Sequence, residues 1–141
     1  YETRPVLNTS GPAPRLAFEV RLPPGLALPA DAGAIRAELH TEKNKMSGRL
    51  SGAAPRSEDG RAVIAGDVEV YYRSSWRLLE IKVPGQDDRL FQLNLPSSPR
   101  RSTEFTRWQR AQFIATPGLS QPRKAGPDEA FEIRYRMIWV E

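Results

Sequence analysis

The sequence predicts an all-β protein, an antiparallel β-sandwich of immunoglobulin-like architecture. Several short stretches alternate between apolar and polar residues, which is the pattern of a strand with one buried face. The 13 Pro and 10 Gly residues suit many short strands separated by turns better than long helices. With 141 residues, the chain is long enough to bury the core of one domain. A small β-barrel built from the same strands is the alternative.

The first 14 residues read as an N-terminal arm, and residues 15–141 as a single sandwich domain. Residues 1–14 are rich in Pro, Gly, Ser and Thr, which is typical of a linker. A strand is expected over 15–22, where every second residue is apolar from Leu16 to Leu22. The following Pro-Pro-Gly ends it, because Pro lacks the N–H that a sheet needs.

A second strand is expected over 34–40, with Ile35, Ala37 and Leu39 on its inner face. A short strand is expected over 46–50. Residues 51–60 have the composition of a surface loop.

Residues 61–96 read as three consecutive strands joined by short turns at 73–75 and 85–88. Short connections favour antiparallel pairing of neighbouring strands. We therefore expect a meander here that organises the rest of the fold.

The last strand, over 131–140, has the clearest pattern in the chain. Five large apolar residues share one face and require a second sheet to cover them: Phe131, Ile133, Tyr135, Met137 and Trp139.

The connection between Pro96 and Phe131 is too long for an unstructured loop in a compact domain. We expect a short helix or turn at 102–107, in which Ser102 could cap a helix with Glu104 in its first turn. A strand is favoured at about 108–114, although the sequence leaves a helix open there.

Composition excludes several functional classes. The chain has no Cys, so a disulfide, a thiol nucleophile and a thiolate metal site are excluded. No apolar run approaches the roughly 18 residues of a membrane-spanning helix. The excess of Arg (17) over Lys (4) is typical of a GC-rich bacterial genome. Because the chain starts at Tyr1 rather than Met, we expect an extracytoplasmic protein, periplasmic or membrane-anchored, with a signal peptide or anchor before Tyr1.

Positive charge is concentrated in the connection 97–125, which we call the basic connection. It carries six cations and Glu104, a net charge of +5, so the rest of the chain sums to −1. Such a segment attracts an acidic protein surface or anionic membrane head groups. The expected interaction surface adds two cations from the outer face of the last strand, and comprises Arg100, Arg101, Arg107, Arg110, Arg123, Lys124, Arg134 and Arg136.

Three aromatic residues suggest an alternative binding surface. Tyr71, Tyr72 and Trp76 flank the first turn of the expected meander, and neighbours on a strand point to opposite faces. Some of these rings must therefore lie outward, where they could hold a sugar. Nucleic-acid binding is disfavoured, because Phe105 and Trp108 beside the arginines fit the core better and no nucleic-acid motif is present.

Evidence for catalysis or metal binding is slight. His40 is the only histidine, and Glu38 and Glu42 share its strand face. Residues two apart on a strand diverge, and zinc sites usually have more His or Cys ligands, so a solvent-facing His is favoured. No catalytic motif occurs, although a small enzyme with a carboxylate site assembled by the fold stays open. The sequence thus predicts a non-catalytic binding or scaffolding module without cofactor or metal, and leaves its oligomeric state open.

Overall fold

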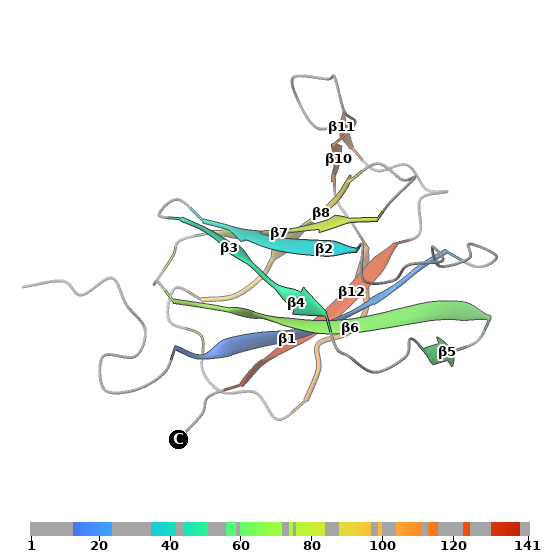
Figure 1. The fold of residues 1–141 in the computed structure, drawn as a ribbon, viewed down its shortest axis with the longest axis horizontal. Coiled ribbons are helices and arrows are strands. Elements are labelled where there is room, and N and C mark those ends of the chain that lie inside the picture. Colours follow the sequence, from blue (N-terminus) through green and yellow to red (C-terminus); the bar gives the residue numbers. More distant parts are fainter. Residues whose placement is uncertain are drawn as a thin grey trace, which may run out of the picture.

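The computed structural model describes part of the chain, and every structural statement below refers to that part. The described residues are 13–23, 35–41, 44–50, 56–58, 60–71, 74, 76–83, 88–96, 99, 104–110, 113–115, 123–124 and 131–138. They form two antiparallel sheets that lie over each other as two layers (Figure 1).

The first sheet is built around the pairing of strands from the two ends of the domain. Strand β1 lies between β6 and β12 in a continuous antiparallel register. Three short strands widen the sheet, two of them beside β6 and one beside β12. Its members are β1 (Arg15–Arg21), β4 (Arg49–Leu50), β5 (Arg56–Glu58), β6 (Arg61–Glu69), β9 (Gln109–Arg110) and β12 (Glu132–Ile138).

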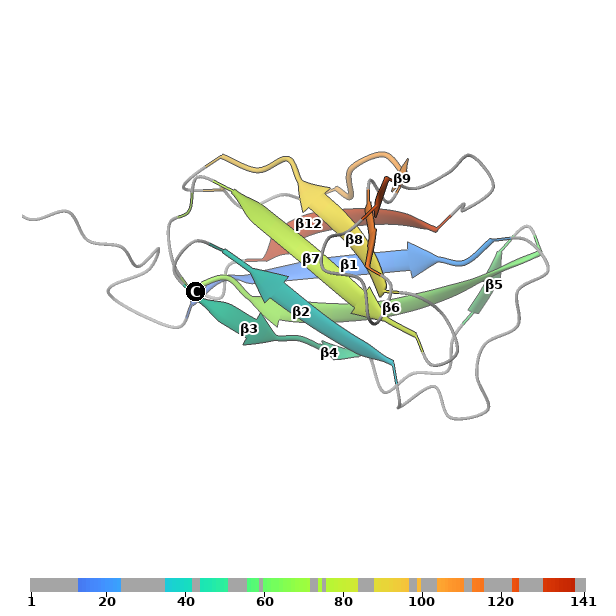
Figure 2. The ribbon, with the colours of Figure 1, turned by 90° about the horizontal axis from the view of Figure 1, so that it is seen from above.

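The second sheet has the order β11-β10-β8-β7-β2-β3. Its three longest strands are adjacent, and Figure 2 shows them crossing above β1, β6 and β12. Its members are β2 (Arg36–His40), β3 (Lys45–Ser47), β7 (Arg77–Lys82), β8 (Asp88–Leu93), β10 (Phe113–Ala115) and β11 (Arg123–Lys124).

The core lies between the two layers and is built from the alternating apolar residues. On β1 and β12 the expected inner residues are buried to within 1% exposure, from Leu16 and Phe18 to Tyr135 and Met137. The Tyr135 hydroxyl accepts a hydrogen bond from the backbone N–H of Asn94, 2.9 Å away, and so links the two layers. The prediction of an all-β fold with two packed sheets is confirmed. The described strands form two separate sheets rather than one closed barrel.

The predicted meander over 61–96 is wrong in its first part. Strand β6 pairs with β1 in the first sheet, whereas β7 and β8 pair with each other in the second. Between β6 and β7, the described residues Val70 and Ser74 are buried. The alternation of apolar and polar residues shows which side chains point inward, but it does not show which sheet a strand joins. In the sequence, the connection between β6 and β7, which lie in different sheets, could therefore not be distinguished from a hairpin turn.

The basic connection also differs from the prediction. Residues 104–107 are not helical, because this segment lies along the edge of β12, where the Thr106 N–H donates to the Tyr135 carbonyl oxygen at 2.9 Å. The strand expected over 108–114 is divided into β9 and β10, which belong to different sheets. The stretch 51–60, expected to be a surface loop, contains the short strand β5, and the basic connection also contains the short strand β11.

Other elements agree with the sequence. The strands expected over 15–22, 34–40 and 131–140 are present as β1, β2 and β12. The single strand expected over 46–50 is instead divided into the short strands β3 and β4, which belong to different sheets. Residues 1–12 of the arm, Ser102 and Trp139 lie outside the described residues. Within the described ranges, the chain contains no helix of the length and apolarity that crossing a bilayer demands.

Candidate functional site

The residues of the predicted basic surface are distributed over several places. Arg100 and Arg101 lie outside the described residues, and Arg107 is exposed. Arg110 lies on β9, the terminal strand of the first sheet. Arg123 and Lys124 lie on β11, the terminal strand of the second sheet. The structure therefore places part of the basic connection along sheet edges.

The two cations of the last strand contact neighbouring side chains. Arg134 forms an ion pair with Glu19, with its Nε 2.6 Å from the Glu19 Oε1. Its guanidinium also lies 4.6 Å from the ring centre of Trp108 and 5.1 Å from that of Phe105. Arg136 stacks on the same Phe105 ring at 5.1 Å. The aromatic rings of the basic connection thus cover arginines of β12.

The same outer face holds further arginine–carboxylate pairs. Glu132 accepts hydrogen bonds from Arg21 Nε at 2.9 Å and from Arg61 Nη1 at 2.7 Å. Partial burial raises the pKa of Glu132, but the hydrogen bonds and charges of these two arginines outweigh it, so the net pKa is lowered. The carboxylate is therefore held in its ionised form. Asp67 is bound in the same way, by Arg15 at 2.5 Å and Arg49 at 3.0 Å.

We call this outer surface of β1, β6 and β12 the arginine face. Its acids are Glu19, Asp67 and Glu132, and its cations are Arg15, Arg21, Arg49, Arg61 and Arg134. Arginine forks match carboxylates in geometry as well as charge. Each of these acids is therefore paired with at least one arginine of the same face.

Two of the three predicted ligand aromatics are described, and both are exposed. Tyr71 is 40% exposed and Trp76 is 43% exposed, while Tyr72 lies outside the described residues. The backbone of Trp76 is hydrogen-bonded to Ser74, which is 1% exposed. The Ser74 hydroxyl donates to the carbonyl oxygen of Trp76 and accepts from its N–H at 3.3 Å. The Trp76 ring is thus presented on a fixed backbone.

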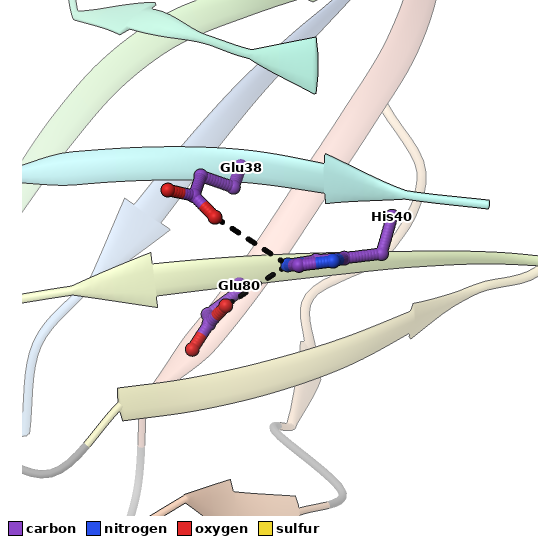
Figure 3. Close-up of side chains that lie close together, drawn as sticks. All are labelled: Glu38, His40 and Glu80. Carbon is purple, nitrogen blue, oxygen red and sulfur yellow. Dashed lines mark hydrogen bonds and ion pairs between the residues drawn. The ribbon is translucent and has the colours of Figure 1, made fainter. Parts of the chain in front are cut away.

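A cluster of acid and imidazole groups lies on the outer face of the second sheet (Figure 3). The register places Glu38 on β2 directly opposite Glu80 on β7, and His40 follows two residues along β2. His40 Nε2 lies 2.9 Å from Glu80 Oε1 and 3.6 Å from Glu38 Oε2. We call these three residues the His–Glu cluster.

Further charges surround this cluster. Two lysines approach Glu38, Lys82 at 3.6 Å and Lys45 at 3.8 Å. Burial raises the pKa of Glu80, but its side-chain hydrogen bonding with Asp88 and His40 and the charges of Lys82 and His40 outweigh that effect, so the net pKa is lowered. Glu80 is therefore ionised although its side chain is only 13% exposed.

Sequence reasoning identified two members of the cluster and missed the third. Glu38 and His40 stood out because they share a strand face, whereas Glu42, the other proposed neighbour, lies outside the described residues. Glu80 is 40 residues away and joins the pair only through the register of β2 and β7. The alternation of Leu79, Glu80 and Ile81 indicates that Glu80 points outward, but the sequence does not show that its strand, β7, pairs with β2.

Comparisons of the chain with protein-family models, with curated proteins and with solved structures find no match.

Proposed function

We propose that the protein is a non-catalytic binding module with an immunoglobulin-like sandwich architecture. The two packed antiparallel sheets support this proposal, since such sandwiches commonly bind ligands through the loops at their ends. An extracytoplasmic location is part of the same proposal, and the composition of the chain is compatible with it.

The observation that carries the proposal is the exposure of Trp76 on a fixed backbone. A Trp ring that is 43% exposed leaves much apolar surface in water, and such surface often marks a binding site. The buried Ser74 holds the adjacent backbone through two hydrogen bonds. Little conformational freedom of that backbone would be lost on binding, which favours affinity.

A carbohydrate is the ligand class that fits this surface best. The faces of Trp and Tyr rings offer flat apolar area with a polar edge, which suits the C–H face and hydroxyl groups of a sugar ring. Tyr71 is also exposed, on the same connection between β6 and β7. We therefore infer that Trp76 is the stacking residue and that Tyr71 assists it.

Tryptophan fluorescence over a panel of soluble glycans tests this function. A glycan that binds should change the emission of the wild type and of Trp108→Phe, but not of Trp76→Ala. The Trp108 variant is the matched control, because that ring lies against Arg21 and Arg134 rather than on the proposed surface. A response that persists in Trp76→Ala would refute the assignment.

A second proposed function uses the basic connection to bind an acidic protein surface or anionic head groups. Exposure of Arg107 favours it, as does the placement of Arg110, Arg123 and Lys124 on terminal strands. Cations on edge strands also prevent edge-to-edge association, so the same placement has a structural use. Binding of this kind should weaken steeply with salt and should be lost when Arg107 and Arg110 are replaced together by Ser.

A further inference from the structure

We propose that Glu38, His40 and Glu80 form a binding site for a divalent transition-metal ion of the Zn²⁺ class. This inference goes beyond the proposed binding function and does not depend on it. It differs from the expectation drawn from the sequence, in which His40 faced solvent without a metal.

The first argument is the placement of two carboxylates directly opposite each other. Glu38 and Glu80 are partners in the register of β2 and β7, which both lie inside the second sheet rather than at its edge. Like charges in directly opposed positions destabilise a sheet unless a cation lies between them. The group that lies between them is the His40 imidazole, a ligand for transition metals.

The second argument is the spacing of the donor atoms. Two ligands bound at about 2.0–2.1 Å to a tetrahedral ion are separated from each other by about 3.3 Å. The two separations from His40 Nε2, 2.9 Å to Glu80 and 3.6 Å to Glu38, lie on either side of that value. All three donor atoms lie within 4.8 Å of one another, so small side-chain rotations would bring them to one ion.

The chemistry of the donors selects the class of metal. An imidazole nitrogen suits Zn²⁺ and neighbouring transition ions, whereas Mg²⁺ and Ca²⁺ prefer oxygen ligands alone. Three protein ligands leave a fourth position open, as is usual in sites that also bind water or another molecule. Asp88 shares a side-chain hydrogen bond with Glu80 and would help to orient the Glu80 carboxylate toward the ion.

Lys45 and Lys82 lie near Glu38 and would compete with a metal ion for its carboxylate, so replacing a lysine tests the site. Lys45 and Lys82 approach Glu38 no closer than 3.6 Å, and their side chains are 62% and 41% exposed. These distances are too long for hydrogen bonds, so the lysines screen Glu38 without occupying the point where the donors converge. Removal of the Lys45 charge should strengthen metal binding, since a divalent ion is repelled by a nearby ammonium.

Isothermal titration calorimetry of tag-free, metal-free protein with ZnCl₂ tests the site. We expect one ion to bind per chain, at least a tenfold loss of affinity in His40→Gln and in Glu80→Gln, and tighter binding in Lys45→Met. MgCl₂ should give no comparable binding. Glu69→Gln is the matched control, because Glu69 is a partly exposed strand glutamate that pairs with Arg15 in the other sheet.

Two results would overturn the proposal. One is the absence of Zn²⁺ binding to the wild type. The other is equal affinity in the wild type and His40→Gln, which would indicate adventitious surface binding. Circular dichroism checks that each variant is folded. If His40→Gln or Glu80→Gln did not fold, Lys45→Met would decide the question, because its lysine is exposed and weaker binding there would contradict the site.

Discussion

The outer faces of the two sheets both carry acidic and basic side chains but arrange them differently. On the arginine face, Glu132 and Asp67 are each held by two guanidinium groups. In the His–Glu cluster, two carboxylates share one imidazole, and the nearest lysines stay at 3.6 Å or more. Arginine remains protonated at any ordinary pH, whereas an imidazole can exchange its proton for a metal. We infer from this difference that the first arrangement stabilises the fold, and we propose that the second binds a metal ion.

The largest effect that would separate the two faces is expected at Glu132. Replacement by Gln removes a charge that accepts hydrogen bonds from Arg21 and Arg61 and is 16% exposed. Charge-assisted hydrogen bonds of this kind contribute about 2 kcal/mol, so the free energy of unfolding should fall by about that amount at pH 7. Urea denaturation measures the change. A loss below about 0.5 kcal/mol would show that the pair is not structural.

The same residue predicts a pH dependence. Because the folded-state pKa of Glu132 is lowered, the ionised carboxylate contributes stability above its unfolded-state pKa. That contribution should disappear as the pH falls below about 4.5 and through the folded-state pKa. The difference in unfolding free energy between wild type and Glu132→Gln should therefore be constant near pH 7 and shrink in acid. A difference that grows in acid would contradict the lowered pKa.

A smaller effect is expected from removing the aromatic cover of the arginine face. Trp108 lies 4.4 Å from the Arg21 guanidinium and 4.6 Å from that of Arg134. Cation–π contacts at such partly buried positions contribute about 1 kcal/mol, so Trp108→Ala should lower the unfolding free energy by about that amount. Trp76→Ala is the control, and its exposed ring should change stability by less than about 0.5 kcal/mol. Equal losses would mean that Trp108 does not stabilise this face.

The smallest effect is expected at Glu38. In the metal-free protein, Glu38→Gln removes attraction to two lysines but also relieves repulsion from Glu80. These terms nearly cancel, so the unfolding free energy should change by no more than about 0.5 kcal/mol. Thermal and urea unfolding of both glutamate variants can be compared directly. A loss as large as that of Glu132→Gln would make the two faces energetically alike.

The sequence predicted individual strands well because alternation is a local property. The inner residues of β1, β2 and β12 are those that the period-two pattern placed inward, from Leu16 to Met137. The assignment of strands to sheets failed at β6, because a connection that changes layers has the same composition as a hairpin turn. The short strands β5, β9 and β11 are two or three residues long, which is too short for a periodic pattern.

The sequence singled out two of the three residues of the His–Glu cluster. Glu38 and His40 are readable as neighbours on one strand face, but Glu80 requires the register of β2 and β7. Arg134 and Arg136 were correctly placed on the outer face of β12. Their contacts with Phe105 depend on where the basic connection lies, which no local pattern specifies. Long-range pairing is thus the information that the sequence alone lacked.

The most direct test of the metal site uses the fact that His40 is the only histidine in the chain. In tag-free ¹⁵N-labelled protein, every imidazole NMR signal comes from this one residue. Addition of Zn²⁺ should shift the Nε2 resonance, reach saturation at one equivalent, and leave the imidazole of Glu80→Gln nearly unchanged at the same concentration. An Nε2 resonance that does not respond to Zn²⁺, or that responds equally in Glu80→Gln, would contradict a metal site on this face.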